Sequence, residues 1–339
     1  MKNKPLILII IAIITVAAVA GTLLYKPPAV KAKIGYMPAA SYGLLWVAYE
    51  KGYFKDEGLD ITLKEYPSLG QLVTALASGE IDGAPITSVA IAAFIKNIDA
   101  KIVAGNSLDG TALVVNSSFG LEDLTGLRGM ILGTVQYVPG DFIFKRVISE
   151  AGINLTIKEY FTPSDTLTAL ESNKVDAALL WEPYASLAEY RDLRIAVWDE
   201  AIYPKDYPCC LQVFSNSFIS SNPDAIVKFI KALVKAEAFT YAHSDEALPM
   251  VKKYLPSVPI EIVYKSIFFT DPSLNRARNP LSAYINLTEL QQFYRLLVPN
   301  LLTENDYSVL VSKIDPSYYQ TAISELKREG FNLPSRYAG

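Results

Sequence analysis

Few residues in this chain could act as catalysts or metal ligands. His243 is the one histidine among 339 residues, so an HExxH zinc site cannot form and a serine–histidine–aspartate triad has little scope. Cys209 and Cys210 are adjacent, which fits neither a CxxC redox motif nor a zinc knuckle. We interpret them as small buried structural residues, with a strained vicinal disulfide as the alternative. These residues predict a protein that is not an enzyme and that needs no metal or cofactor.

Aromatic rings, hydroxyls and two carboxylates gather instead in four short windows that contain no lysine or arginine: residues 36–43, 83–88, 134–141 and 180–184. A sulfonate or nitrate held there would depend on hydroxyls and helix N-termini. An aromatic, partly cationic heterocycle would stack on the rings and donate to a carboxylate, which uses the set more fully. The candidate ligand-binding residues are Tyr36, Ser41, Tyr42, Thr87, Ser88, Gln136, Tyr137, Asp141, Trp181, Glu182 and Tyr184.

Several of these side chains also have structural interpretations. Trp181 is the strongest single candidate, because a predicted strand ends there and delivers its last side chain to the sheet edge. Asp141 could contact a ligand or cap a helix that begins near Phe142. Glu182 could contact a ligand or orient the turn at Pro183. Each tyrosine could instead pack in the core or at the rim, because the chain contains 21 tyrosines.

An internal repeat indicates which elements must position these windows. Residues 57–84 match residues 151–178 at eleven of 28 positions, with a constant offset of 94. Each copy predicts an alternating strand (61–66 and 155–160), a helix with Thr-Ala-Leu at its centre, and a second short strand. A further strand, loop and helix precede each copy. The chain therefore contains two β-α-β-α-β units, which form parallel sheets with helices on both faces.

Two such units predict an α/β clamshell, in which each lobe is a sheet flanked by helices and a ligand cleft lies at the carboxyl ends of the strands. We expect residues 31–105 in lobe one, 106–210 in lobe two, and a mostly helical return to lobe one over 211–339. The crossings between lobes, and hence the hinges, are predicted near 103–112 and 207–214. Helices are expected from Pro223, after Asn222 as cap, and near 246–254, 260–268, 288–297 and 316–328.

The first 30 residues predict contact with a membrane. Lys2 and Lys4 precede an uncharged apolar run over residues 5–25, which is long enough to span a bilayer. The run is either an uncleaved anchor, which we favour, or a signal peptide cleaved after Ala20. Both place the lobes outside the cytoplasm, on the cell surface or released. A net charge of −4 gives no basic excess, which argues against a nucleic-acid partner.

Four segments resemble one family of proteins: residues 43–60, 78–83, 124–133 and 181–184 are similar to motifs of the nitrate/sulfonate/taurine and thiamine-precursor solute-binding proteins of ABC importers. The similarity runs in order over residues 33–240. It implies a two-lobed periplasmic-binding-protein-like clamshell (type II), here with an N-terminal hydrophobic helix. The chain departs from the family pattern in having no lipobox cysteine near its N-terminus.

The resemblance also implies a function and partners. We expect a monomer that captures a small-molecule solute, either a sulfonate, taurine or nitrate or a thiamine-pyrimidine precursor, for an ABC permease and its ATPase. One alternative is an enzyme of the same fold that makes the thiamine pyrimidine, but that group depends on histidine and a cysteine-rich segment. A second alternative is a tethered ligand-sensing domain.

Overall fold

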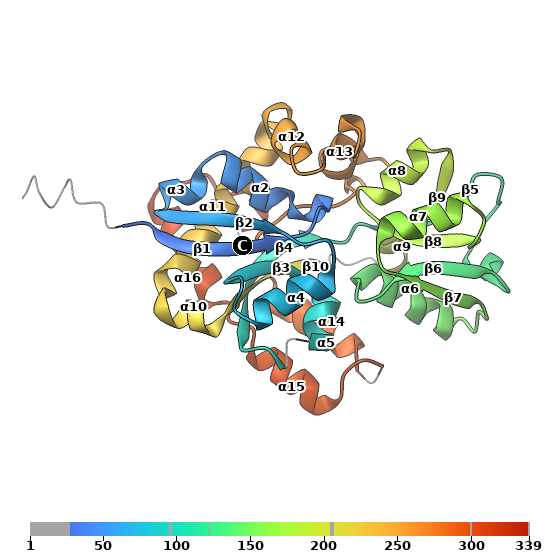
Figure 1. The fold of residues 1–339 in the computed structure, drawn as a ribbon, viewed down its shortest axis with the longest axis horizontal. Coiled ribbons are helices and arrows are strands. Elements are labelled where there is room, and N and C mark those ends of the chain that lie inside the picture. The colour runs from blue at the N-terminus through green and yellow to red at the C-terminus, as the bar shows by residue number, and fades with distance from the viewer. Residues whose placement is uncertain (1–27, 95–96, 122, 204–206, 299, 338–339) are drawn as a thin grey trace, which may run out of the picture.

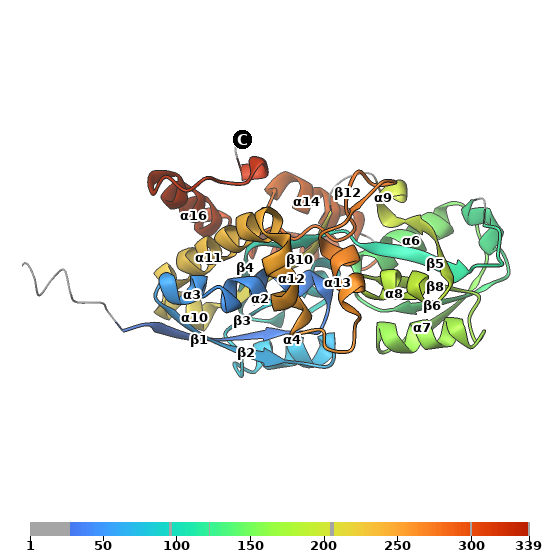
Figure 2. The ribbon, with the colours of Figure 1, turned by 90° about the horizontal axis from the view of Figure 1, so that it is seen from above.

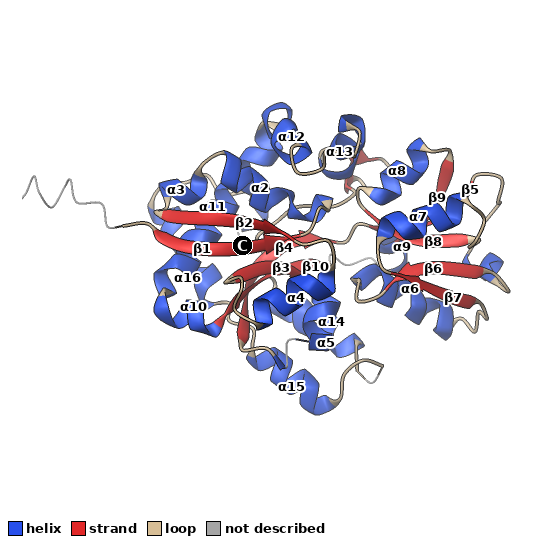
Figure 3. Cartoon of the chain, in the orientation of Figure 1, coloured by secondary structure: helices blue, strands red, loops and turns tan. Residues whose placement is uncertain are grey.

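The structure, a computed structural model, describes residues 28–337 apart from 95–96, 122, 204–206 and 299. The apolar run over 5–25, predicted as an anchor or signal peptide, lies outside these residues. Within them, no helix is both long enough and apolar enough to cross a membrane. Two lobes lie side by side in Figures 1 and 2, and Figure 3 shows that each has a sheet with helices against it.

The first lobe contains a five-stranded sheet in the order β2-β1-β3-β10-β4. Its strands are β1 (Val30–Tyr36), β2 (Leu59–Glu65), β3 (Gly83–Thr87), β4 (Ala100–Leu108) and β10 (Pro208–Ser215). β1 is parallel to β2 and β3, whereas β10 is antiparallel to β3 and β4. The helices of this part of the chain are α2 (Gly43–Glu50), α3 (Tyr53–Asp56), α4 (Leu69–Ala77) and α5 (Ser88–Phe94), with η1 (Ala40–Tyr42) before α2.

The second lobe repeats this plan, with the sheet order β7-β6-β8-β5-β9. Its strands are β5 (Thr111–Asn116), β6 (Ile131–Val135), β7 (Thr156–Tyr160), β8 (Ala177–Trp181) and β9 (Leu193–Trp198). Its helices are η3 (Leu124–Leu127), α6 (Pro139–Glu150), α7 (Pro163–Glu171), α8 (Tyr184–Tyr190) and α9 (Asp199–Ile202). β6 is parallel to β7 and β8, as β1 is to β2 and β3. The two predicted β-α-β-α-β units are confirmed. The prediction of parallel sheets is wrong, because β10 in lobe one and β5 in lobe two run antiparallel to both of their neighbours and make each sheet mixed.

The aspartates that the repeat shares do the same work in both lobes. Asp82 accepts a hydrogen bond from the backbone N–H of Lys33 at 2.7 Å, and Asp176 accepts one from Ile131 at 2.8 Å. In each lobe the carboxylate after the second helix thus joins the start of the third strand to the first strand. The repeat in the sequence records this shared strand contact.

The return segment is mostly helical, as expected. Its elements are α10 (Asn216–Ser221), α11 (Pro223–Ala242), α12 (Ser244–Lys252), α13 (Ile260–Ile267), β11 (Thr270–Asp271), β12 (Arg276–Ala277), α14 (Leu287–Leu296), α15 (Glu304–Ser312), α16 (Ser317–Arg328) and η4 (Ser335–Tyr337). The predicted helices correspond to α11, α12, α13, α14 and α16. Asn222 is the N-cap residue of α11, but its side chain makes no capping hydrogen bond. The hairpin formed by β11 and β12 was not predicted. The helix α15 was not predicted either, although Thr303 and Asp306 form a capping box at its start.

The first crossing between the lobes is shorter than the sequence predicts, and the second is displaced. β4 ends at Leu108 and β5 begins at Thr111, so the first crossing is Asp109 and Gly110. Gly110 has a φ of +98°, and a Cβ there would lie 2.8 Å from Nδ2 of Asn279, which requires glycine. The second crossing precedes Pro208. The predicted hinge at 207–214 is wrong for most of its length, because β10 pairs with β3 and β4 within lobe one.

Two buried carboxylates tie the crossings together. Asp109, from the first crossing, accepts a hydrogen bond from the backbone N–H of Tyr207 at 3.1 Å and pairs with Arg276. Asp199, just after β9, accepts from the backbone N–H of Thr111 at 2.8 Å and from the Tyr207 hydroxyl. Burial raises the pKa of Asp109 well above its usual range and the pKa of Asp199 to about 6. We call these five residues the crossing cluster.

Candidate ligand-binding site

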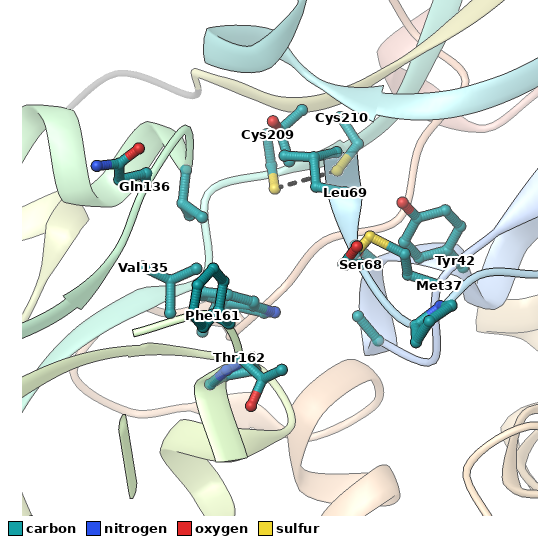
Figure 4. A pocket seen from close by; sticks show the side chains of 17 residues that line it. Met37, Tyr42, Ser68, Leu69, Val135, Gln136, Phe161, Thr162, Cys209 and Cys210 are labelled. Atoms are coloured by element: carbon teal, nitrogen blue, oxygen red, sulfur yellow. Dashed lines mark hydrogen bonds between the residues drawn. The ribbon is translucent and has the colours of Figure 1, made fainter. Parts of the chain in front are cut away.

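A cavity lies between the lobes, where the carboxyl edges of the two sheets face each other (Figure 4). It spans about 580 Å³ of space not filled by atoms, part of which is open to solvent. Met37, Tyr42 and Ser68 approach it from lobe one, Val135, Gln136, Phe161 and Thr162 from lobe two, and the two cysteines form another wall. The lining is Met37, Ala39, Ser41, Tyr42, Pro67, Ser68, Leu69, Thr87, Val135, Gln136, Val138, Phe161, Thr162, Pro163, Trp181, Cys209 and Cys210.

The repeat places matching loops on both sides of this cavity. Ser68 and Thr162 occupy equivalent positions at the offset of 94, and each side chain caps the following helix. The Ser68 Oγ accepts from the backbone N–H of Gln71 at 3.4 Å, and the Thr162 Oγ1 accepts from Asp165 at 3.1 Å. Both helices therefore begin at the cavity with their N-terminal ends.

Five of the predicted ligand-binding residues line the cavity: Ser41, Tyr42, Thr87, Gln136 and Trp181. Trp181 is the last residue of β8 and pairs with Thr111 of β5, so the sheet fixes its backbone. The Tyr42 hydroxyl donates to the carbonyl oxygen of Pro85 at 3.1 Å, which holds the ring against the cavity wall. The predicted windows thus supply part of the lining from both lobes.

Three predicted residues pack behind the lining. Tyr36 donates through its hydroxyl to Glu65 at 3.1 Å, and its ring packs edge-on against Trp46. Ser88 is fully buried at the start of α5. Tyr184 packs against Trp181 with the ring centroids 6.5 Å apart. None of the three lines the cavity, so a direct contact with a solute is still only a prediction for them.

Tyr137 joins the two lobes beside the cavity. Its carbonyl oxygen accepts a hydrogen bond from Oγ1 of Thr87, in lobe one, at 2.7 Å. Its ring lies 4.8 Å from the ring of Phe94, also in lobe one. The backbone of Tyr137 has a φ of +64°, a conformation that is uncommon for a residue with a side chain. Tyr137 therefore closes one side of the space between the lobes.

Glu182 is turned away from the cavity and is fully buried. Its carboxylate accepts from the hydroxyls of Ser186 at 2.7 Å and Ser266 at 3.0 Å, and Arg278 lies beside it at 3.8 Å. Burial raises the pKa of this carboxyl. These partners favour the interpretation that Glu182 holds the turn, because the donors belong to α8 and to the return segment.

Arg278 links the return segment to lobe two. The guanidinium of Arg278 pairs with Asp271 at 2.8 Å and with Glu189 of α8, and Lys265 of α13 reaches Glu189 at 2.9 Å. Figure 2 shows α13 and β12 between the lobes. We call Glu182, Glu189, Asp271 and Arg278 the return cluster. It fixes lobe two against a segment from far along the chain.

Asp141 does not cap the helix that follows it, so that expectation is wrong. The helix α6 begins at Pro139 with Val138 as its N-cap residue, which places Asp141 inside the first turn. Its buried carboxylate pairs with Lys145 at 2.9 Å. Burial raises the pKa of Asp141 to about 6, against the opposing effect of Lys145. Asp141 does not line the cavity.

Sequence reasoning missed the loops after β2 and β7, which supply Pro67, Ser68, Leu69, Phe161, Thr162 and Pro163. The predicted windows followed only the first and third strands of each repeat, yet the second strands end at the same sheet edge. Met37, Ala39, Val135 and Val138 lay within or beside the windows but were not singled out. Phe161 is 94% exposed, which is unusual for so large an apolar side chain.

The cysteines were interpreted as structural, and this interpretation is incomplete because both line the cavity. The lining contains no charged side chain and no histidine. His243 lies at the end of α11, stacked on Phe239 with centroids 4.9 Å apart. In the part of the chain that the structure describes, no group of three histidine, cysteine, aspartate or glutamate residues could hold a metal ion.

Comparisons with known proteins identify relatives. The model of the NMT1-like family matches residues 25–252. A Bacillus subtilis protein named as an aliphatic sulfonates-binding protein is 30% identical over 238 residues, which cover 66% of this chain and 70% of that protein. A Saccharomyces cerevisiae 4-amino-5-hydroxymethyl-2-methylpyrimidine phosphate synthase is 23% identical over 272 residues, 68% of this chain and 73% of the synthase.

A solved structure has the same fold. The alkanesulfonate-binding protein SsuA from Xanthomonas axonopodis pv. citri, bound to MOPS, gives a TM-score of 0.70 and covers 86% of this chain and 100% of that chain at 17% identity. The expected two-lobed clamshell is therefore confirmed. So is the resemblance seen in the sequence, and the chain belongs to the NMT1-like family.

Proposed function

We propose that this protein captures a small solute outside the cytoplasm and presents it to the permease and ATPase of an ABC importer. The observation that carries this proposal is the cavity between two lobes that are joined by short crossings, because such lobes can close on a solute and open again. Membership of the NMT1-like family supports it. The protein acts as a monomer, tethered by residues 5–25 or released after cleavage at Ala20.

The lining favours a planar, largely apolar solute over a free inorganic anion. Tyr42, Phe161 and Trp181 offer rings, and no lysine or arginine lines the cavity to pair with an anion. The helices of lobe two that begin there, α6 and α7, each carry an aspartate in the first turn, which opposes a negative charge. Each also begins with proline, which lacks an N–H donor.

Lobe one offers most of the hydroxyls in the lining. The hydroxyls of Ser41, Ser68 and Thr87 lie in the lining, and α4 has no acidic residue in its first turn. A neutral ring with hydrogen-bonding groups at one edge would place that edge on lobe one and its apolar part against lobe two. A sulfonate, as bound by relatives of this chain, would have to rest on the N-terminus of α4, these hydroxyls and the uncharged polar side chains of Gln136 and Thr162 in lobe two.

Binding without turnover fits the lining better than catalysis does. The synthase-like alternative rests on a relative of 23% identity, and the cavity offers neither a histidine nor a carboxylate as a general acid or base. We infer that the solute leaves unchanged. The tethered sensory domain lacks any supporting feature in the described residues.

A thermal-shift panel on the full-length protein in mild detergent tests the proposal. Aminopyrimidines, taurine, aliphatic sulfonates including MOPS, nitrate and bicarbonate are compared at equal concentrations. Binding raises stability by RT ln(1 + [L]/Kd), about 2.7 kcal/mol at a hundredfold excess over Kd, and ring compounds are expected to give the largest rise in Tm. Shifts with nitrate or taurine but with no ring compound would reject the proposed solute class, and chemical conversion of the bound compound would reject binding without turnover.

A further inference from the structure

A defect in the strand β10 brings both cysteines to the cavity. Consecutive side chains of a regular strand point to opposite faces of the sheet. The pairing of β10 with β4 shifts register on both sides of Cys210, which lies opposite Ser107 of β4 and Thr87 of β3. Such a bulge places two successive residues against one partner residue and re-aims a side chain. Both thiols therefore line the same cavity.

The two sulfur atoms are close and screened from bulk solvent. The Sγ atoms of Cys209 and Cys210 lie 3.4 Å apart and share a hydrogen bond (Figure 4). Both cysteines are free thiols, 9% and 1% exposed respectively. Only a molecule small enough to enter the cavity can reach them. A protein partner or a second copy of the chain is excluded by this burial.

The pair is chemically unequal. The hydrogen bond between the two thiols lowers the pKa of Cys210, whereas the same interaction and burial raise the pKa of Cys209. The thiolate is the reactive form of cysteine. The lower pKa favours Cys210 as the attacking thiol, and Cys209, whose Sγ lies 3.4 Å away, is the neighbour that can complete a disulfide.

We propose that Cys209 and Cys210 form a redox-modification site, in which a small-molecule disulfide that enters the cavity converts the two thiols reversibly into a vicinal disulfide. The Cys210 thiolate attacks one sulfur of the reagent and releases one small thiolate, leaving a mixed disulfide. Cys209 then loses its proton, attacks Cys210 Sγ and releases the second small thiolate. The pair loses two electrons and two protons, and the reagent becomes two thiols.

The vicinal disulfide is a reversible modification rather than a stabilising structural disulfide. Consecutive Cα atoms lie about 3.8 Å apart, whereas disulfides prefer about 4.4–6.8 Å, so a vicinal disulfide is strained and easily reduced. Oxidising conditions outside the cytoplasm supply disulfides, and this step rests on the proposed location. Oxidation would draw the sulfurs from 3.4 Å to about 2.05 Å and remove both S–H donors from the cavity wall.

The experiment uses the full-length protein in mild detergent, first reduced and then exposed to bis(2-hydroxyethyl) disulfide, a small uncharged reagent that can enter the cavity. Titratable thiols are expected to fall from two to none per chain, with a mass loss of two hydrogen atoms within the peptide that contains residues 209–210. Dithiothreitol should restore both thiols. Because Trp181 lines the same cavity, the oxidation should change the tryptophan fluorescence of the wild type, and Trp181→Phe should remove most of this change.

Two matched variants test the order of attack. Cys209→Ser should stop at one bound 2-mercaptoethanol group, because Cys210 has no neighbour to complete the disulfide. Cys210→Ser should react at least tenfold more slowly. Equal rates for the two variants would overturn the assignment of Cys210 as the attacking thiol.

The wild type alone decides the rest. Two thiols that persist in the folded protein but react in urea would overturn the proposal, and so would a disulfide between two chains. These outcomes are independent of the solute panel, which uses reduced protein. Failure of the panel with successful oxidation would reject the solute class and leave the redox site standing.

Discussion

The cavity wall and the segments that connect the lobes are built from opposite kinds of side chain. The wall is uncharged, although it faces a space that solvent can enter. The crossing cluster and the return cluster contain carboxylates and arginines, most of them buried. We infer that the charged clusters fix the geometry of the lobes, whereas solute selection depends on the rings and hydroxyls of the cavity wall.

Loss of Arg278 is expected to have the largest effect, because it removes the cation at the centre of the return cluster. Arg278 is 5% exposed and pairs with Asp271 and Glu189 beside Glu182. Arg278→Ala leaves buried carboxylates without their cation, which should lower the free energy of unfolding by about 3–5 kcal/mol. Urea denaturation measures the loss.

The matched control is Arg295→Ala, which removes an exposed pair with Glu304. The free energy of unfolding should then change far less than in Arg278→Ala, because solvent screens an exposed ion pair. Equal losses in the two variants would show that the return cluster adds nothing beyond a surface ion pair.

Asp141 tests whether a buried charge near the cavity affects stability, because its carboxyl is buried but does not belong to the cavity lining. Its pKa is raised to about 6, so between about pH 4 and pH 6 the folded state holds a proton that the unfolded chain has released. This group's contribution to the free energy of unfolding therefore falls as pH rises through that window. From about pH 4 to pH 7 the wild type should lose up to about 3 kcal/mol relative to Asp141→Asn.

Urea denaturation of both proteins across this pH range checks the prediction. The loss of the ion pair with Lys145 adds an offset to the variant, so the slope against pH is the informative quantity. Parallel pH profiles would contradict the raised pKa.

Trp181→Ala removes an aromatic ring from the uncharged cavity wall. Loss of a ring contact removes about 0.5–1.5 kcal/mol beyond the buried area, so the Kd for a ring compound selected by the thermal-shift panel should rise at least tenfold. Isothermal titration measures the change. Tyr190→Ala, an exposed ring outside the cavity, should bind as the wild type does. If Trp181→Ala also binds normally, the solute contacts lie in the loops at 36–43 and 83–88.

Thr87→Val should have the smallest effect. It removes the donor to the carbonyl oxygen of Tyr137 and keeps the side chain's volume nearly constant. A hydrogen bond of this kind contributes about 0.5–1.5 kcal/mol, which corresponds to a change of about two- to tenfold in the Kd for the same ring compound. Unchanged affinity would mean that the Thr87 hydroxyl neither favours the closed form through Tyr137 nor contacts the solute from the cavity lining.

The sequence predicted the strands and helices that belong to the internal repeat or show a regular hydrophobic period. The offset of 94 between the two copies revealed both sheets, because strand and helix patterns are local. The partners of Glu182 in the return segment could not be found this way: Ser266, a hydrogen-bond donor, and Arg278, an ion-pair partner, lie far along the chain and carry no periodic signal. The role of Cys209 and Cys210 depends on a bulge, which alternation along the strand does not predict.

The matched caps Ser68 and Thr162 also have a consequence for how the protein can be redesigned. They hold α4 and α7 in place, while their neighbours in the lining differ between the lobes: Pro67 and Leu69 on one side, Phe161 and Pro163 on the other. Each capping side chain therefore keeps its helix start in place, while the residues beside it in the lining differ between the lobes. A library confined to residues 67 and 161 could alter solute preference one lobe at a time while leaving both helix starts intact.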